Sequence, residues 1–367
     1  MAARKKLSAK KRRKVKVIVF IVEIVLLLIV LAALYVSLKL AKLDSGQKIK
    51  DSDRKVNEDI NDQTSETMET YRNIALFGLD NRSNGNYEEG NSDVIIICSI
   101  NEKTKEVRLV SVYRDTYLYM TEDKHGYRKA NAAYAYGGYT QAVNMLNVNL
   151  DLDIEDYVSF DFNAVANAID ILGGVEVEIT DAEAKYMTGY IEEVARLSGK
   201  EAHYLSGGGT YVLDGVQATA YGRVRQTAGS DYKRTERQRL IISKLVEKAQ
   251  KSDIATINNL IDEIFPDIKT SFTVTELLNL AKDAFDYKLG ETTGFPFEKQ
   301  GVNLGYALDC VAPVDLAYNV EELHKFLFEN EEYEVSYTVQ QISDQIVENT
   351  GLKRKETTEE TTEGTSE

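Results

Sequence analysis

Residues 73–78 read NIALFG, residues 93–100 read DVIIICSI and residues 107–113 read VRLVSVY, and these three apolar runs decide the fold. Each run is short and rich in the β-branched and aromatic residues that are typical of strands. The polar stretch 101–106 separates the second run from the third and predicts a hairpin connection. We therefore expect three antiparallel strands that are neighbours in one sheet.

Charged residues stand at one end of these predicted strands. In an antiparallel meander, the end of the first strand, the start of the second and the end of the third meet at one edge. Taken alone, Asp80 and Asp93 are better interpreted as ordinary turn residues flanking the loop 81–92. The meander nevertheless predicts that one edge gathers Asp80, Arg82, Asp93, Arg114 and Asp115.

Helical and strand patterns alternate along the rest of the chain. Gly173 and Gly174 end one helical pattern, as glycines commonly do. A later pattern has an apolar face that includes Leu240, Ile241 and Leu245. Helices are predicted at 140–150, 162–172, 274–285 and 321–328, a strand at 175–179, and a further helix from about residue 231. The alternation indicates an α/β domain.

The N-terminus predicts a membrane anchor. Residues 1–16 carry nine basic and no acidic residues, and residues 17–38 form an apolar run long enough to span a bilayer. A basic flank before a first span stays cytoplasmic, so the chain after Lys39 is expected outside the cell membrane. A cleaved signal peptide is the alternative, although its apolar region would be shorter and end at small residues.

Composition divides the remainder of the chain. Residues 39–69 are polar and predict an extracytoplasmic linker, whereas the Thr- and Glu-rich residues 347–367 predict a disordered acidic tail. One large domain is expected between them, at residues 70–346. The five predicted segments are thus 1–16, 17–38, 39–69, 70–346 and 347–367.

Charge and cysteine content exclude several functions. The net charge is −15, and because residues 1–38 contribute +8, the rest carries −23. Such an acidic surface does not suit nucleic acid, whose phosphates require a basic partner. Cys98 and Cys310 are the only cysteines, which excludes a disulfide framework and a multi-cysteine metal site.

An arginine-rich stretch begins at residue 221 with YGRVRQ and continues at residue 231 with DYKRTERQ. In an extended segment Arg223 and Arg225 point to the same face. On a helix after Asp231, Arg234 and Arg237 also share a face. Guanidinium groups directed at one place need an anion between them, and their planar forks suit phosphate oxygens. A solvated charged helix face is the alternative interpretation.

Six ordered blocks change the balance between these interpretations. They are NIALFGLDNR (73–82), NSDVIIICSIN (91–101), VSVYRDTYLYM (110–120), KANAAYAYGG (129–138), DYVSFDFNAVANAIDILGGVEVEI (156–179) and LDGVQATAYGRVRQTAGSDYKRTERQRLII (213–242). Together they resemble the LytR-CpsA-Psr family, continuously from about residue 71 to 250 and more weakly to about 346.

The resemblance implies a three-layer α-β-α domain with a mixed central sheet, preceded by one transmembrane helix. It implies an enzyme that binds polyprenyl pyrophosphate-linked glycans, of the teichoic acid or capsular polysaccharide type, and transfers the glycan phosphate to peptidoglycan in a Gram-positive-type envelope. It also implies Mg²⁺ as the cofactor. The lipid tail is expected in an apolar channel between sheet and helices, which no period in the sequence distinguishes from core.

The resemblance also assigns roles residue by residue. Asp80 and Asp93 match magnesium ligands. The positions that match the pyrophosphate lining are Arg82, Arg114, Lys129, Arg223, Arg225, Arg237 and Gln238. Asp115 and Arg234 match further motif positions, and we group them with Arg114 and Asp231 as catalytic candidates. Asp231 or Asp93 could accept the acceptor hydroxyl's proton; we favour Asp231, because a metal-bound carboxylate is a poor base.

Three positions depart from the family pattern. Asn91 and Val94 stand where the family usually has arginine and threonine, which puts one phosphate contact in doubt, and Tyr113 replaces a proline.

Other functions stay open: a pyrophosphatase that releases glycan phosphate to water, a non-catalytic lipid-binding scaffold, or transfer to a surface protein. A transcriptional role, which the family name suggests, conflicts with an acidic domain outside the membrane.

Overall fold

The computed structural model describes most of the chain between Lys48 and Arg354. The described residues are 48–79, 90–122, 124–226, 230–264, 267–272, 276, 280, 286–305 and 308–354, without the side chains of 230, 231, 254, 258 and 261. The predicted span 17–38, Asp80, Arg82 and the tail from residue 355 lie outside them. Within these ranges, no helix is both long enough and apolar enough to cross a membrane.

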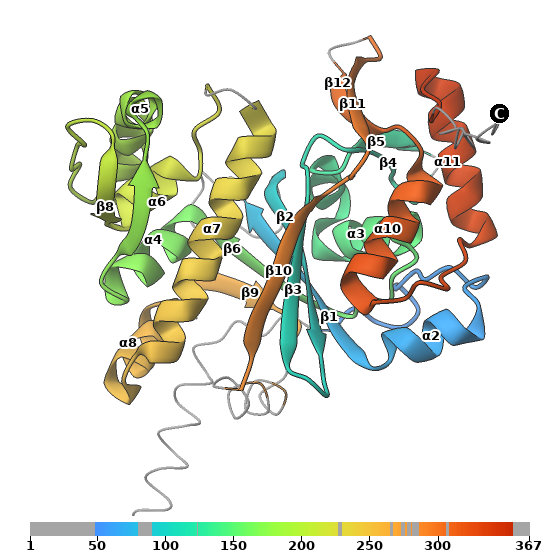
Figure 1. Cartoon of the computed structure of the whole chain (residues 1–367), viewed down its shortest axis with the longest axis horizontal. Coiled ribbons are helices and arrows are strands. Elements are labelled where there is room, and N and C mark those ends of the chain that lie inside the picture. Colours follow the sequence, from blue (N-terminus) through green and yellow to red (C-terminus); the bar gives the residue numbers. More distant parts are fainter. Residues whose placement is uncertain are drawn as a thin grey trace, which may run out of the picture. The chain divides into compact units, whose positions relative to one another are not determined.

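A six-stranded mixed sheet lies at the centre of the domain (Figure 1). In spatial order its strands are β10 (Lys288–Phe295), β3 (Glu106–Val112), β2 (Ser92–Asn101), β1 (Tyr71–Leu79), β6 (Asp156–Asp161) and β9 (Ile268–Thr270). β1, β2 and β3 pair antiparallel, which confirms the predicted meander. β6 runs parallel to β1 and β10 runs parallel to β3, so the sheet is mixed as expected.

Helices cover both faces of this sheet (Figure 1). One face carries α3 (Ala132–Leu150), α10 (Leu316–Phe328) and α11 (Tyr337–Thr350), and the other carries α7 (Ser230–Lys251). Successive residues of a strand point to opposite faces, so Ile95 and Ile97 of β2 enter one apolar cluster whereas Val94 and Ile96 enter another. This two-sided burial explains why β2 is a continuous apolar run rather than an alternating one.

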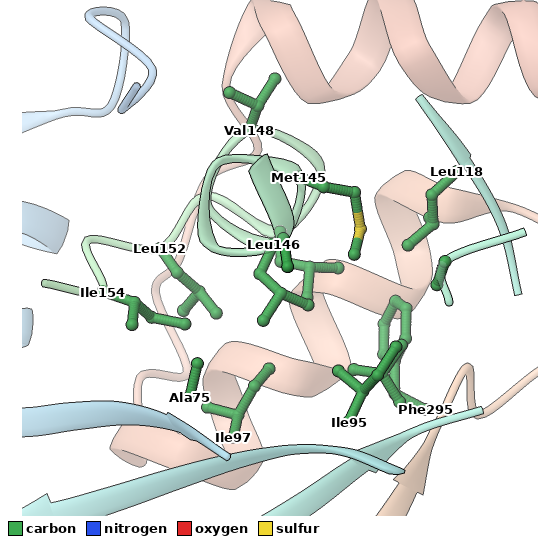
Figure 2. Close-up of a cluster of buried hydrophobic side chains, with 14 of the residues drawn as sticks. Ala75, Ile95, Ile97, Leu118, Met145, Leu146, Val148, Leu152, Ile154 and Phe295 are labelled. Carbon is green, nitrogen blue, oxygen red and sulfur yellow. The ribbon is translucent and has the colours of Figure 1, made fainter. Parts of the chain in front are cut away.

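The larger core lies between the sheet and α3. Figure 2 shows Leu146 and Met145 of α3 pointing toward Ala75, Ile95 and Ile97 of the sheet. All five side chains are buried. Removing a large buried aliphatic side chain from such a cluster typically costs about 2–5 kcal/mol, so this contact fixes α3 on the sheet.

A second, smaller core holds the helices that follow β6. It joins α4 (Phe162–Ile171), α5 (Asp181–Ser198) and α6 (Gly215–Tyr221) with the hairpin of β7 (Val175–Ile179) and β8 (Gly209–Leu213). The predicted stop after α4 is confirmed: Gly173 and Gly174 have φ of 76° and 80°. A Cβ on Gly174 would lie 2.7 Å from the Leu213 carbonyl oxygen, so glycine is required there.

Shorter elements complete the domain. They are α2 (Asp62–Met68), α8 (Ile254–Ile264), β4 (Tyr117–Tyr119), β5 (Tyr127–Lys129), β11 (Lys299–Asn303) and β12 (Asp309–Pro313).

The predicted domain boundaries differ from the structure at both ends. Residues 48–69 pack on the domain instead of forming a spacer: Met68 is buried in the larger core, and the Asn57 side chain donates to the Val148 carbonyl oxygen at 2.9 Å. At the other end, the predicted domain boundary at residue 346 falls inside α11, which continues to Thr350. Ile346 belongs to the larger core, so the last turn of this helix is part of the domain. Cys98 and Cys310 are free thiols.

Candidate functional site

Asp93 lies at the centre of a group of arginines. It is the second residue of β2. Arg114 is the second residue after the end of β3, the antiparallel neighbour of β2. Arg114 Nη1 donates to Asp93 Oδ1 at 2.8 Å, and Arg225 Nη2 donates to Oδ2 at 3.2 Å. Arg234 Nη2 donates to the Asp93 backbone oxygen at 3.3 Å. The predicted meeting of Asp93 with Arg114 at one edge is therefore observed.

The charges around Asp93 keep it ionised. Burial alone would raise the pKa of its carboxyl, but Arg114, Arg234 and Arg225 together outweigh burial and hold the pKa below its ordinary value. Arg234 is almost fully buried, at 2% exposure, so its charge needs a nearby anion. Asp93 thus acts as the counter-ion that offsets the repulsion between the three guanidinium groups and keeps them close together.

A second carboxylate extends the network. Lys129 Nζ lies 3.1 Å from Asp115 Oδ1, and Arg114 Nε lies 3.4 Å from Asp115 Oδ2. Two backbone bonds keep the chain after β5 beside the turn after β3: Asn131 N donates to the Arg114 oxygen at 2.9 Å, and Ala130 N donates to the Thr116 oxygen at 2.8 Å. Lys129 is thereby placed in the same network as Arg114 and Asp115.

A polar cavity of about 370 Å³ opens beside this network. Within it, Arg223 Nη2 donates to Glu193 Oε1 at 3.2 Å, and the guanidinium lies 5.0 Å from the Phe162 ring centre. Arg223 Nη1 is buried and has no hydrogen-bond partner among the described residues. The lining residues of the cavity are Asn91, Asp93, Arg114, Asn131, Tyr190, Glu193, Arg223 and Arg225.

Arg237 is not among the residues that line the polar cavity, and it lines a separate cavity together with Glu183. Its Nε donates to Glu183 Oε1 at 2.8 Å, and its Nη1 donates to the Val224 carbonyl oxygen at 2.9 Å. The expectation that Arg234 and Arg237 converge on one anion is therefore wrong for this structure. The reason is Glu183, a buried carboxylate at the start of α5 that takes Arg237 as its counter-ion. By bonding Val224, Arg237 fixes the backbone between Arg223 and Arg225.

A small apolar cavity of about 40 Å³ has a different set of lining residues. Val94, next to Asp93, lines it, and so does Phe162, whose ring Arg223 covers. Gln238 also lines it and donates through Nε2 to the Gly222 oxygen at 3.2 Å, so this residue faces the apolar cavity and not the cluster around Asp93. Its other lining residues are Phe160, Val165, Thr219, Gly222, Ile241 and Ile242.

The predicted metal ligands can be compared with the structure only at Asp93. Its carboxylate oxygens are hard donors that retain lone pairs beside their arginine contacts, so Asp93 suits one coordination position of Mg²⁺. Asp80 and Arg82 lie outside the described residues, as does the side chain of Asp231 at the start of α7. Among the residues that are described, no group of three His, Cys, Asp or Glu side chains is placed to hold a metal.

Sequence reasoning missed the contribution of α5. Tyr190 and Glu193 of this helix line the polar cavity, and Glu183 positions Arg237. Tyr190 and Glu193 are three residues apart and therefore share a helix face. That spacing was visible in the sequence, but nothing in it indicated that the face meets Arg223.

The LytR_cpsA_psr family model matches residues 34–303. The chain belongs to the LytR-CpsA-Psr family. TagU of Enterococcus faecalis, named a polyisoprenyl-teichoic acid–peptidoglycan teichoic acid transferase, is 29% identical over 237 residues, or 63% of this chain and 72% of that protein. TagV of Bacillus subtilis has the same kind of name and is 28% identical over 236 residues, or 59% of this chain and 58% of that protein.

Solved structures of other LytR-CpsA-Psr proteins share this fold. The crystal structure of B. subtilis TagV matches with a TM-score of 0.55 at 24% identity, covering 72% of this chain and 98% of that one. A structure described as TagT bound to LIIa-WTA matches with a TM-score of 0.50 at 20% identity, covering 78% and 92%. The expected α/β domain with a mixed sheet is thus confirmed.

Proposed function

We propose that this chain transfers a glycan phosphate from a polyprenyl pyrophosphate-linked cell-wall polymer, of the teichoic acid or capsular type, to peptidoglycan. One observation carries the proposal: Arg114, Arg223 and Arg225 line one polar cavity, and Arg223 lies 5.0 Å from the ring centre of Phe162, a residue that lines an apolar cavity. A lipid-linked pyrophosphate has the same two parts, an anion that suits guanidinium forks and a hydrocarbon chain that suits apolar walls. The names of TagU and TagV support the choice of substrate and acceptor.

The protein's part in this reaction is positioning and charge neutralisation. The acceptor hydroxyl oxygen forms a bond to the glycan-side phosphorus, and the bond from that phosphorus to the bridging oxygen breaks, so polyprenyl phosphate leaves. Arg223 and Arg225 stabilise the charge that moves to the leaving phosphate. Asp231 accepts the hydroxyl proton.

The residues proposed to hold Mg²⁺ are Asp80 and Asp93. When bound there, the ion supplies positive charge to the pyrophosphate oxygens. Asp93 also keeps Arg114 and Arg225 oriented through its two carboxylate oxygens. Lys129 and Asp115 extend the network and fix the Arg114 side chain.

The place of the reaction is part of the proposal. Residues 1–16 would remain in the cytoplasm, residues 17–38 would cross the cell membrane, and the acidic domain would act outside it. This arrangement brings the polar cavity to the side of the membrane where peptidoglycan is assembled.

A reconstitution tests the function. The full-length protein in detergent would receive magnesium, a short polyprenyl pyrophosphate-linked glycan and a peptidoglycan oligomer, and the products would be identified by mass spectrometry. Glycan phosphate on the oligomer is expected. Free glycan phosphate alone would identify a pyrophosphatase, lipid binding without turnover would identify a scaffold, and transfer only to a protein acceptor would replace peptidoglycan; each of these results contradicts the proposal.

A matched pair of variants links any activity to the cavity. Arg225→Ala removes a guanidinium that lines the cavity and contacts Asp93. Arg128→Ala removes an exposed arginine next to Lys129 on β5. We expect turnover to fall by about a hundredfold or more in the first variant and to stay at the wild-type rate in the second. Equal turnover rates for Arg225→Ala and Arg128→Ala would show that Arg225 is not part of the site.

A further inference from the structure

A cavity of about 440 Å³ lies at the end of the sheet opposite to the arginine cluster. Asn73, the third residue of β1, lines this cavity. Gly78 stands five residues further along the same strand and pairs with Val94, the neighbour of Asp93. At about 3.4 Å per residue, the two places are about 17 Å apart along the strand. The cavity is therefore separate from the proposed reaction site, and its volume is within the range of small-molecule sites.

The lining of this cavity is strongly acidic. Seven acidic and two basic residues line it, and we call it the acidic cavity. Both basic side chains already have carboxylate partners. Arg72 Nη2 lies 2.7 Å from Asp156 Oδ2, and Lys48 Nζ lies 2.5 Å from Glu276 Oε1. The protein's own cations therefore leave most of the negative charge of the cavity uncompensated.

Three of the lining carboxylates have no partner within the part of the chain that the structure describes. Glu58, Glu69 and Glu102 are exposed, and their side chains make no hydrogen bond or ion pair to a described residue. Exposed carboxylates are commonly only solvated. A second feature has to decide whether a ligand binds here.

That feature is Asn73, a lining side chain that is almost fully buried. Asn73 is 7% exposed, and its Oδ1 has no hydrogen-bond partner among the described residues. Buried amides normally have partners, because losing water without a replacement costs free energy. A half-turn about the last bond of the side chain exchanges the amide oxygen and nitrogen without changing the shape of the group, so the oxygen can be presented to the cavity. Asn73 and the acidic lining thus point independently to a ligand that donates hydrogen bonds and carries positive charge.

A protonated amine fits this lining better than a metal ion does. In the described ranges, no three acidic, histidine or cysteine side chains are placed to hold a metal. An ammonium group needs no fixed ligand geometry, because its three N–H donors rotate. Val56, Ile60 and Met68 also line the acidic cavity, and an alkyl stem can lie along such side chains while its charged end stays at the carboxylates. Together these features select a primary alkylammonium group.

We propose that the acidic cavity binds a primary alkylammonium group, with Asn73, Glu69 and Glu102 as its acceptors. The inference does not depend on the proposed function, because the acidic cavity shares no lining residue with the polar cavity. Two sources carry this chemistry: a free diamine or polyamine, and the lysine-type side chain of a peptide.

Isothermal titration calorimetry on the full-length protein in detergent tests the inference with two probes. Nα-acetyl-lysinamide carries the ammonium group, and Nα-acetyl-norleucinamide has the same alkyl stem without it. We expect only the lysine probe to bind, and to bind more weakly as the salt concentration rises. Asn73→Leu should weaken its binding by about tenfold and Glu102→Gln by about twofold to fivefold. Glu178→Gln, which removes an exposed carboxylate from β7, is the control and should leave the affinity unchanged.

Thermal unfolding separates a binding role of Asn73 from a structural one. Asn73→Leu removes a buried amide oxygen that has no partner, so the melting temperature should not fall. A lower melting temperature with unchanged affinity would assign Asn73 a structural role and overturn the inference. If Asn73→Leu does not fold, the exposed position of Glu102 keeps the inference testable, because Glu102→Gln at wild-type affinity would overturn it.

The remaining outcomes concern the ligand. Equal binding of the two probes, binding of neither, or displacement of the lysine probe by an equal concentration of Ca²⁺ would each overturn the inference. Cadaverine, a free diamine, distinguishes the two sources. Tighter binding of the lysine probe than of cadaverine supports the inference with a peptide as the source, and the reverse order supports it with a free polyamine.

Discussion

Glu183→Gln should destabilise the domain by about 3 kcal/mol, because it leaves a buried arginine without its counter-ion. Glu183 Oε1 accepts from Arg237 Nε at 2.8 Å, and Oε2 accepts from the backbone N and Oγ1 of Thr180 at 2.9 and 2.8 Å. Glu183 is 9% exposed and Arg237 is 5% exposed. Glutamine keeps the size of the side chain and one acceptor oxygen, so the variant removes mainly the charge. Loss of a helix cap alone costs about 1 kcal/mol. The size of the measured loss therefore distinguishes removal of the Arg237 counter-ion from removal of the cap at Thr180.

A double-mutant cycle assigns this energy to the pair. Arg237→Met removes the cation, and in the double variant neither partner is charged, so the double variant should be more stable than the sum of the single losses predicts by about 2 kcal/mol. The assay is urea unfolding of the compact unit that begins at Ser45, carried through to Arg354. A loss of unfolding free energy below about 1 kcal/mol for Glu183→Gln would refute the reasoning. So would an equal loss for Glu183→Gln in the wild type and in the Arg237→Met variant.

The same pair makes stability depend on pH. Burial alone would raise the pKa of Glu183, but the bonds from Thr180 and Arg237 outweigh it and the pKa lies below its ordinary value. The native state therefore binds fewer protons than the unfolded state, and the stabilisation is fully present above the unfolded pKa of about 4.3. It is lost as pH falls through the lower native value. The stability difference between wild type and Glu183→Gln should accordingly shrink below about pH 4.

Three further predictions concern the site and the core. Asp93→Asn should lower the transfer rate by about a hundredfold or more, since Arg114 and Arg225 lose the charge that orients them; the rate at pH 7 measures this, and a rate near wild type would contradict it. Removal of magnesium with a chelator should abolish transfer and its return should restore it, whereas undiminished transfer would exclude the metal. Leu146→Ala should cost about 2–5 kcal/mol in urea unfolding, because Leu146 is fully buried, while Leu289→Ala on the exposed side of β10 serves as the control; equal losses would refute the assignment of the core.

Local pattern was sufficient to predict much of the fold. The runs 73–78 and 93–100 lie within β1 and β2, and the run 107–113 covers β3 from its second residue and ends one residue after it. A sheet covered on both faces favours nearly continuous apolar strands, which is why these runs were recognisable. The strand 175–179 matches β7, and the glycines after α4 have the positive φ that a helix stop requires. The meander also predicted the contact of Asp93 with Arg114, since antiparallel pairing joins the start of one strand to the end of the next.

Spacing was less informative about the partner of each charge. Helical periodicity correctly placed Arg234 and Arg237 three residues apart on α7, but it could not indicate that Glu183 of α5 would attract only Arg237. The polar composition of residues 39–69 predicted a spacer, although a few apolar side chains such as Met68 suffice to anchor residues 48–69 on the core. In both cases the deciding contact comes from an element distant in the sequence.

The sequence by itself therefore determined the three neighbouring strands β1, β2 and β3, the helix stop after α4 and the meeting of Asp93 with Arg114, because these follow from the pattern of apolar residues and from the antiparallel connection of neighbouring strands. Only the tertiary structure decided which charges meet. It brought Tyr190 and Glu193 of α5 to Arg223, turned Arg237 toward Glu183, and set Phe162, which lines the apolar cavity, beside Arg223 of the polar one. The physical reason is that a helix face is set by residue spacing, whereas what that face contacts is set by how separate elements pack around a common core.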